Sequence, residues 1–279
     1  MKKGINYWSF KEGTPVVEAL EIAKKAGFDG IEFCLAATGE LSLESTDEEI
    51  LSVKKRAEEI EIEMASLASW LPWEHSLTSD HLEDRIKAKD IIRKQMEMAN
   101  KLGTDTILVV PGYVGVDFVP NSEVCAYDQV YDRALEALCE LAVEAEQQNI
   151  TIAIENVWNK FLLSPLEMRD FVDKINSPNV GVYFDVGNVL LTGYPEHWIR
   201  ILGDRIKRVH FKDYRMDPGG FNAFVDLLAG DVHYPEVMTA LKEINYDNYC
   251  TAEMMPTYKH YTDQIIYNTS ATMDRILNY

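Results

Sequence analysis

Short apolar runs alternate along the chain with longer stretches in which apolar residues recur at helical spacing. The short runs are rich in apolar and β-branched residues, which is typical of buried β-strands. Strands are expected at residues 4–8, 28–35, 62–70, 105–112, 150–155, 179–185, 206–213 and 249–254. Helices are expected at residues 14–27, 46–60, about 79–102, about 125–148, from 165 onward, 195–204, about 235–244 and at the C-terminus. This alternation predicts repeated βα units and a parallel sheet.

The expected helix ends share one pattern, which supports the same repeat. In KKAGFDGIEF, NKLGTDTILV, AEQQNITIAI and KEINYDNYCT, a helix ends at Gly or Asn and a strand follows shortly after. Gly and Asn tolerate the left-handed conformation that ends a helix and reverses the chain. At the other helix ends, Thr14 and Thr46 are predicted N-caps, and Pro15 suits the first turn of its helix.

Eight such units close naturally into a barrel, and no linker divides them. The prediction is a single domain, residues 1–279, folded as one (β/α)8 TIM barrel. The alternative is an open doubly wound sheet, which usually carries a phosphate-binding loop. Neither GxGxxG nor GxxxxGK[ST] occurs in the sequence, so the barrel is favoured.

The amino-acid composition argues against some classes of binding partner. The chain has 46 acidic and 27 basic residues, and its formal net charge of −19 opposes binding to nucleic acid or to anionic membranes. Its four cysteines show no CxxC spacing and are expected to be reduced thiols of a cytoplasmic protein. The N-terminus lacks the apolar region of a signal peptide, and no apolar run is long enough to span a membrane.

Four of the expected strands end at polar side chains of the kinds that bind metal ions. They are Glu155 in IAIENVW, Asp185 in VYFDVGN, His210 in RVHFKD and Glu253 in CTAEM. The carboxyl ends of parallel strands meet at one face, so we expect these side chains to converge. Three carboxylates and one imidazole suit one divalent ion, Mn²⁺, Co²⁺, Zn²⁺ or Mg²⁺. The alternative is structural, since acids at strand ends also cap helices or pair with Lys and Arg.

The segments IEN, FDVGN, HFKD and AEM, in this order, resemble the xylose-isomerase-like superfamily of sugar isomerases and epimerases. The resemblance is strongest to the ketose 3-epimerases and the pentulose-5-phosphate 3-epimerases. It implies that Glu155, Asp185, His210 and Glu253 hold the ion, and that Glu155 and Glu253 are the acid/base pair. It also implies a small sugar or sugar phosphate as substrate and a homodimer or homotetramer.

The expected chemistry accounts for these residue types. A divalent ion bound to a ketose carbonyl and the neighbouring hydroxyl lowers the free energy of the cis-enediolate formed on deprotonation. Two carboxylates on opposite faces of the sugar can then remove the proton and return it with inversion. The sequence therefore predicts a metal-dependent sugar isomerase or epimerase.

One residue departs from the resemblance and leaves alternatives open. Several free-sugar 3-epimerases carry His three residues after the Asp of strand six, where this chain has Asn188. Asn forms hydrogen bonds but does not ionise, so the pentulose-phosphate type is favoured. Inosose dehydratase-like and hydroxypyruvate isomerase-like activities remain open on the same fold. An endonuclease IV-like nuclease is a further alternative, although the six His and the negative charge argue against it.

Further residues are candidates for contact with substrate. Lys212 and Arg215 follow His210 closely and are predicted to meet a phosphate or a ketose oxygen. The alternative for Lys212 is that it neutralises Asp213 or the carboxylate cluster. Trp8 and Trp158 follow strands and are predicted to wall the substrate pocket, although aromatic residues at strand ends also pack beneath loops. Glu32 ends the GIE run of the second strand and is expected either to orient a ligand or substrate or to form a buried salt bridge.

Overall fold

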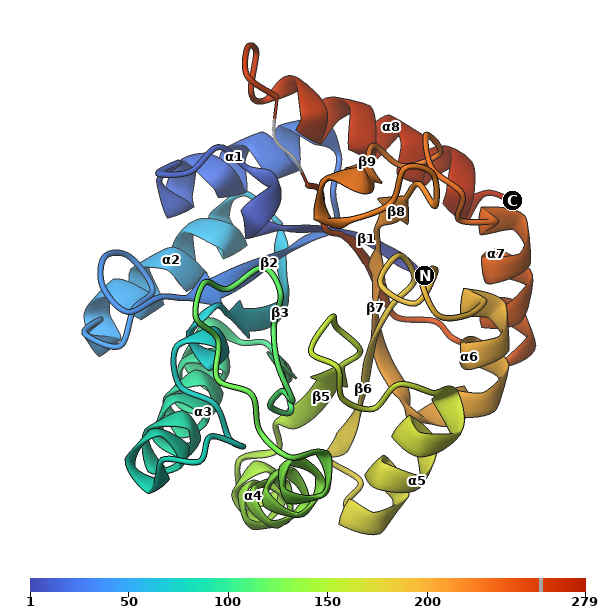
Figure 1. The fold of residues 1–279 in the computed structure, drawn as a ribbon. Helices are drawn as coiled ribbons and strands as arrows, with labels where there is room; N and C mark the ends of the chain where they lie inside the picture. The colour runs from blue at the N-terminus through green and yellow to red at the C-terminus, as the bar shows by residue number, and fades with distance from the viewer. Residues whose placement is uncertain (256–257) are drawn as a thin grey trace.

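The computed structural model describes residues 1–255 and 258–279, and its centre is a closed barrel of parallel strands (Figure 1). The barrel strands are β1 (Lys2–Asn6), β2 (Gly30–Leu35), β3 (Glu63–Ser69), β4 (Thr106–Val109), β5 (Thr151–Glu155), β6 (Val180–Asp185), β7 (Ile206–Phe211) and β10 (Tyr249–Ala252). Around the barrel they run β1, β10, β7, β6, β5, β4, β3, β2, and β2 pairs with β1 again. The predicted (β/α)8 barrel is confirmed.

Helices follow the strands and form a ring outside the barrel (Figure 1). They are α1 (Val16–Ala26), α2 (Asp47–Glu59), α3 (Leu82–Leu102), α4 (Tyr127–Gln148), α5 (Pro165–Ile175), α6 (Pro195–Leu202), α7 (Tyr234–Glu243) and α8 (Gln264–Leu277). The ring closes where α8 packs against both α7 and α1. Within residues 1–255 and 258–279, no helix has the length and apolar character needed to cross a membrane.

The main hydrophobic core fills the space between strands and helices. Strand residues such as Ile5, Ile31 and Phe184 pack there against helix residues such as Leu20 and Ile199. A second buried cluster includes Ala68, Leu108, Val110, Ala153 and Tyr183, on the strands and the loops that follow them. Because the apolar faces of the helices are covered by the sheet, the strands are held rigidly enough to position side chains at their ends.

The ends of the helices follow the chemistry expected from the sequence. Gly27 and Gly103 end α1 and α3 at φ of 86° and 89°, and Asn149 ends α4 at φ of 54°. Thr46 caps α2 in a full capping box with Glu49. The predicted cap at Thr14 is wrong: its hydroxyl donates to Lys11 O, and Pro15 occupies the cap position.

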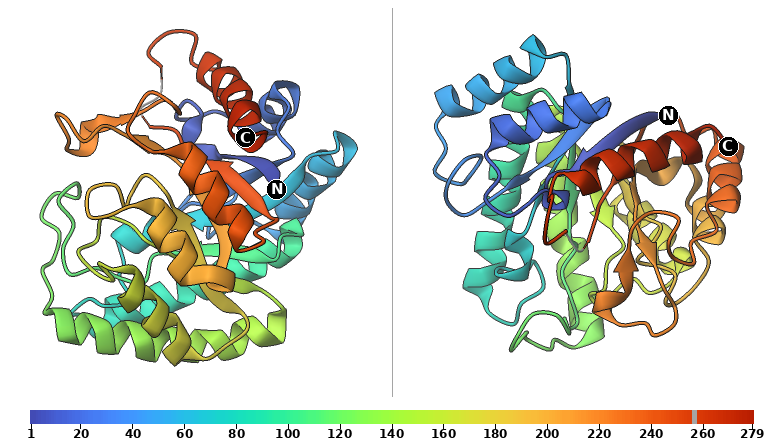
Figure 2. Two further views of the ribbon diagram at one scale, coloured as in Figure 1. Left: turned by 90° about the vertical axis from the view of Figure 1, so that its right-hand side faces the viewer. Right: turned by 90° about the horizontal axis from the view of Figure 1, so that it is seen from above.

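Two segments differ from the expected elements. The first strand was expected at residues 4–8 but covers Lys2–Asn6, because the Asn6 side chain accepts from Trp8 N and caps a 3-10 turn over Tyr7–Ser9. After β7, an antiparallel pair, β8 (Asp213–Tyr214) and β9 (Phe224–Val225), stands outside the barrel. Figure 2 shows that this hairpin and the loop between β4 and α4 extend on the same side of the barrel.

Candidate metal centre and substrate pocket

The four predicted ligands lie at the carboxyl ends of neighbouring strands. Glu155 and Asp185 are the last residues of β5 and β6, His210 is the penultimate residue of β7, and Glu253 follows β10 directly. One nitrogen or oxygen from each side chain lies within 4.8 Å of the corresponding atom of every other. The structure therefore brings together four residues that span about a hundred positions of the sequence.

A shift in strand register contributes to this convergence. Val182 of β6 pairs with Ile206 of β7, but one residue further along the register slips, so that Asp185 pairs with His210. Without that slip Asp185 would lie opposite Val209. Neighbouring residues of a parallel pair face the same side of the sheet, so the irregularity places the carboxylate and the imidazole on one face.

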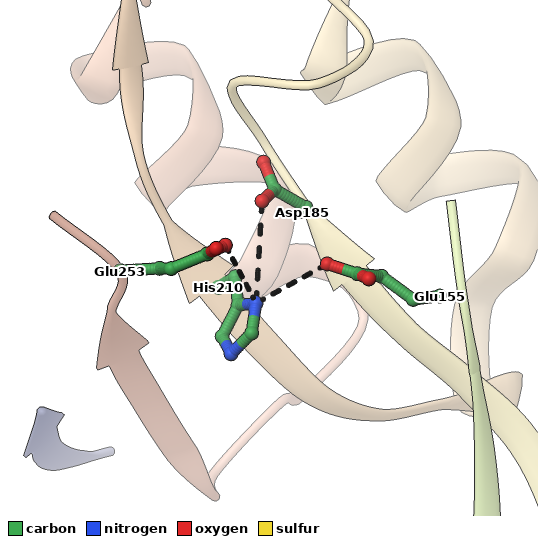
Figure 3. Close-up of side chains that lie close together, drawn as sticks. All are labelled: Glu155, Asp185, His210 and Glu253. Carbon is green, nitrogen blue, oxygen red and sulfur yellow. Dashed lines mark ion pairs between the residues drawn. The ribbon is translucent and has the colours of Figure 1, made fainter. Parts of the chain in front are cut away.

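Three carboxylates surround one nitrogen of His210 (Figure 3). Its Nδ1 lies 3.3 Å from Glu253 Oε2, 3.4 Å from Glu155 Oε1 and 4.0 Å from Asp185 Oδ2. Ligand atoms that each lie about 2.1 Å from a divalent ion are separated from one another by about 3 to 4 Å. The observed spacing fits a shared ion.

Two buried atoms of the cluster have no hydrogen-bond partner among residues 1–255 and 258–279. They are Asp185 Oδ2 and His210 Nδ1, on side chains that are fully buried. The other oxygen, Asp185 Oδ1, accepts from the backbone N–H groups of Gly187 and Asn188 at 2.8 and 2.9 Å. Buried polar atoms without partners are rare because they lose their hydration, and both of these point at the same place. A divalent cation bound there would satisfy them.

Glu32 contacts Nε2 of His210, the ring nitrogen on the side away from the three carboxylates. Its Oε1 lies 2.8 Å from His210 Nε2, and its carboxylate also accepts from the Asn6 amide and the Ser66 hydroxyl. Because an ionised carboxylate only accepts, His210 Nε2 carries the proton in this contact and Nδ1 is directed toward the cluster. A carboxylate that fixes the tautomer and ring orientation in this way is a common support of metal-ligating His. Glu32 therefore forms a buried contact with His210, and its role in orienting a ligand stays a prediction.

Electrostatics in the cluster are those of crowded, buried acids. Burial, with repulsion from Glu253 and Glu155, raises the pKa of the Asp185 carboxyl to about 7. Burial also raises the pKa of Glu155, and Glu253 adds to the shift. Burial alone would raise the pKa of Glu253, but Lys212 and His210 outweigh it and lower that pKa. A divalent ion would favour the ionised form of all three carboxyls.

Above the cluster lies a pocket with mainly aromatic walls. Its lining includes the polar groups Glu155, Glu253, Asn188 and Lys212, and the walls are contributed by Trp8, Trp70, Trp73, Phe118, Trp158, Phe221 and Phe224, among others. Phe118 stacks on Phe221 with ring centroids 5.2 Å apart, so the β4–α4 loop meets the β8–β9 hairpin there. Four of the five predicted substrate-contact residues thus line this pocket, namely Asn188, Lys212, Trp8 and Trp158.

Arg215 is placed differently. It is exposed on the β8–β9 hairpin, and its Nε donates to Ala229 O at 2.8 Å. It is not among the residues that line the pocket. A role for Arg215 in substrate binding stays a prediction.

Several residues that position the site were not singled out in the sequence. Asn156 accepts from Asp185 N and donates to Asp185 O, so it fixes the end of β6. The Asp213 carboxylate accepts from four backbone N–H groups of the hairpin and of the loop that follows it, those of Tyr214, Leu228, Gly230 and Val232. A signal was present in each case, since Asn156 follows Glu155 and Asp213 ends HFKD.

The chain is similar to known proteins in sequence and in fold. The sequence model of the family described as xylose isomerase-like TIM barrel matches residues 20–267. The crystal structure of a D-psicose 3-epimerase with D-tagatose, from Clostridium cellulolyticum H10, superposes with a TM-score of 0.82. That alignment has 20% sequence identity and covers 99% of both chains, which shows that the fold is shared.

Two curated relatives are also similar in sequence. The uncharacterized protein MJ1311 of Methanocaldococcus jannaschii is 28% identical over 170 residues, which are 59% of this chain and 55% of that protein. The chain thus matches about half the length of this relative. A Haemophilus influenzae protein provisionally named L-ribulose-5-phosphate 3-epimerase SgbU is 26% identical over 243 residues, 85% of this chain and 82% of that protein.

Proposed function

Because the chain belongs to the xylose isomerase-like TIM barrel family, we propose that it is a divalent-metal-dependent isomerase or epimerase of a ketose or ketose phosphate. The observation that carries the proposal is the set of four converging ligand atoms, two of them buried without a hydrogen bond to any residue that the structure describes. Such a set has no evident structural use in a barrel that its own sheet already closes. We propose Glu155, Asp185, His210 and Glu253 as the ligands.

The positions of the two Glu residues support proton transfer at a carbon next to the carbonyl. A bound divalent ion would act as a Lewis acid on the substrate carbonyl, which makes the neighbouring C–H proton more acidic. Glu253 and Glu155 approach from opposite sides of His210 (Figure 3). One carboxylate removes the proton from one face of the sugar and the other returns it to the opposite face, with roles exchanged in reverse.

The pocket provides the other features that the reaction needs, which are exclusion of water and contacts to the sugar. Its aromatic walls exclude water, which protects the deprotonated ketose from protonation by solvent. Asn188 and Lys212 line it as hydrogen-bond donors for sugar oxygens, and Trp8 and Trp158 offer ring faces to the sugar. Of the three similar proteins, one is a 3-epimerase of a free ketose and one is provisionally named a 3-epimerase of a ketose phosphate. We therefore propose inversion at carbon 3, with the substrate a pentulose, a hexulose or one of their phosphates.

The test is proton exchange. The purified protein is incubated in D₂O with Mn²⁺ and a panel of pentuloses, hexuloses and their phosphates, and NMR follows both product formation and deuterium uptake. We expect Glu155→Gln and Glu253→Gln to lower the exchange rate by about 10² to 10⁴-fold, the usual contribution of a general acid or base. Glu63→Gln is the control, because Glu63 starts β3 at the opposite end of the barrel.

Two results would count against the proposal. Near-wild-type exchange by Glu253→Gln would remove that residue from the acid/base pair. If no ketose of the panel exchanged, while DNA containing abasic sites was cleaved with Zn²⁺ at catalytic concentrations of protein, the endonuclease IV-like alternative would replace the epimerase.

A further inference from the structure

Lys212 brings an ammonium group into contact with two of the candidate ligands. Its Nζ lies 2.9 Å from Glu253 Oε2 and 3.7 Å from Asp185 Oδ2. These are the same two oxygens that lie 3.3 and 4.0 Å from His210 Nδ1. The lysine therefore contacts the oxygen atoms that face the proposed ion position.

The charged end of Lys212 is buried in the site, between carboxylates and an aromatic ring. Its side chain is 7% exposed, and its Nζ also lies 4.6 Å from the centre of the Phe224 ring, which forms part of the pocket wall. A buried cation needs carboxylate partners to offset its lost hydration. Buried carboxylates without a cation repel one another in the same way. Lys212 and the cluster thus stabilise each other.

We propose that Lys212 is an internal counter-ion of the metal centre, which neutralises the carboxylates before a divalent ion binds and has to leave Glu253 and Asp185 when it does. This inference rests on the proposed metal site and concerns how loading of that site is controlled. In its observed position the ammonium group already lies beside the Phe224 ring and lines the pocket, so a displaced Nζ can move toward the pocket.

Geometry makes the two cations incompatible at close range. An ion about 2.1 Å from Glu253 Oε2 would lie at most about 5 Å from an Nζ that stays 2.9 Å from the same oxygen. Charges of two and one at that separation in a buried site repel strongly. Lys212 therefore stabilises the metal-free protein and weakens metal binding. These effects have opposite signs, which a residue that only packs the site would not produce.

The experiment replaces Lys212 and measures both effects. For Lys212→Met we expect Mn²⁺ affinity, measured by isothermal titration calorimetry, to rise at least about tenfold. We expect the Tm of the same variant without metal to fall by about 5 °C or more, because buried carboxylates lose their partner. Lys212→Arg keeps the charge and should restore both values toward wild type.

The control is Lys160→Met. Lys160 is an exposed lysine near the same rim, and it pairs with the exposed Asp117 at 2.6 Å instead of with a candidate ligand. We expect this variant to keep the wild-type Mn²⁺ affinity and the wild-type Tm without metal. A matching change in both lysine variants would mean that overall charge, and not position, causes the effect, which would overturn the proposal.

The outcomes separate this inference from the proposed function. If wild type binds Mn²⁺ and Lys212→Met binds it equally or more weakly, the counter-ion role is overturned while the metal site stands. If wild type binds none of Mn²⁺, Co²⁺, Zn²⁺ and Mg²⁺, the metal site itself fails. Should Lys212→Met fold only with metal, it is purified with Mn²⁺ and its affinity is taken from competition with a chelator, where weaker binding again overturns the proposal.

Discussion

Replacing Glu32 by Gln removes a negative charge behind His210 and keeps the size and shape of the side chain. Glu32 is fully buried and has three donors around it: His210 Nε2, the Asn6 amide and the Ser66 hydroxyl. His210 Nε2 and the Asn6 amide both donate to Oε1, so the single acceptor oxygen of Gln can face them while its NH₂ group donates to the Ser66 hydroxyl, which can also accept. We expect the hydrogen bond from His210 Nε2 to weaken, because a neutral amide oxygen is a poorer acceptor than a carboxylate, so that the imidazole is held less firmly with Nδ1 toward the carboxylates.

The size of the effect follows from the contacts of Glu32. Partners that orient a metal-ligating His typically contribute 10- to 100-fold in metal affinity, which corresponds to about 1.4 to 2.7 kcal/mol. Glu32 is charged, fully buried and bonded to three groups, and hydrogen bonds of an ionised group are about twice as strong as neutral ones. The expected loss for Glu32→Gln is therefore near the upper end, about 100-fold.

The assay is calorimetric titration with Mn²⁺ at pH 8, which is above the pKa of about 7 of the Asp185 carboxyl. Glu63→Gln is the matched control, since Glu63 is also a strand Glu but accepts from Lys2 and Tyr249 at the other end of the barrel. We expect the control to bind Mn²⁺ as wild type does. If Glu32→Gln bound Mn²⁺ within about twofold of wild type, the claim that Glu32 orients the ligand would be refuted.

Three further outcomes are expected. Mn²⁺ or Co²⁺ at 100 times its Kd should stabilise the protein by about 2.7 kcal/mol, or about 5 to 10 °C in a thermal-shift assay, and no shift would contradict a metal site. Because burial raises the pKa of Asp185 to about 7, protons compete with the ion below that pH. Calorimetric Mn²⁺ affinity should therefore fall as the pH is lowered from 8 to 6, and a constant affinity would contradict this. Asp213→Ala leaves N–H groups of the hairpin and of the following loop unpaired and should lower the free energy of unfolding by about 3 kcal/mol in a urea titration. It should also raise KM by displacing Phe221 and Phe224, whereas an unchanged denaturation midpoint would rule out the proposed role of Asp213.

The sequence by itself determined the architecture and the identity of the four candidate ligands. Strands and helices alternate because short apolar runs alternate with stretches of helical apolar spacing. Gly27, Gly103 and Asn149 end helices at positions where the chain turns back through a residue in the left-handed conformation. Parallel strands of one sheet necessarily bring their carboxyl ends to one side. Polar residues at those ends were therefore predictable as neighbours without any knowledge of side-chain direction.

Only the tertiary structure decided which of these neighbours touch. Two register slips matter: one sets Asp185 opposite His210, and the other sets Glu32 opposite Ser66, which donates to it. A shift of one residue reverses the face that a side chain occupies, and short sequence patterns do not record such irregularities.

The different environments of Lys212 and Arg215 likewise could not be predicted from short sequence patterns. They lie three residues apart, yet one is buried against Asp185 and Glu253 and the other is exposed on a hairpin. The hairpin begins at Asp213, whose carboxylate accepts hydrogen bonds from backbone N–H groups up to 19 residues away. Contacts between residues so far apart depend on how the loop folds back onto the barrel. Sequence spacing therefore located the candidate metal centre, and long-range packing determined which charges surround it and which residues form the pocket walls.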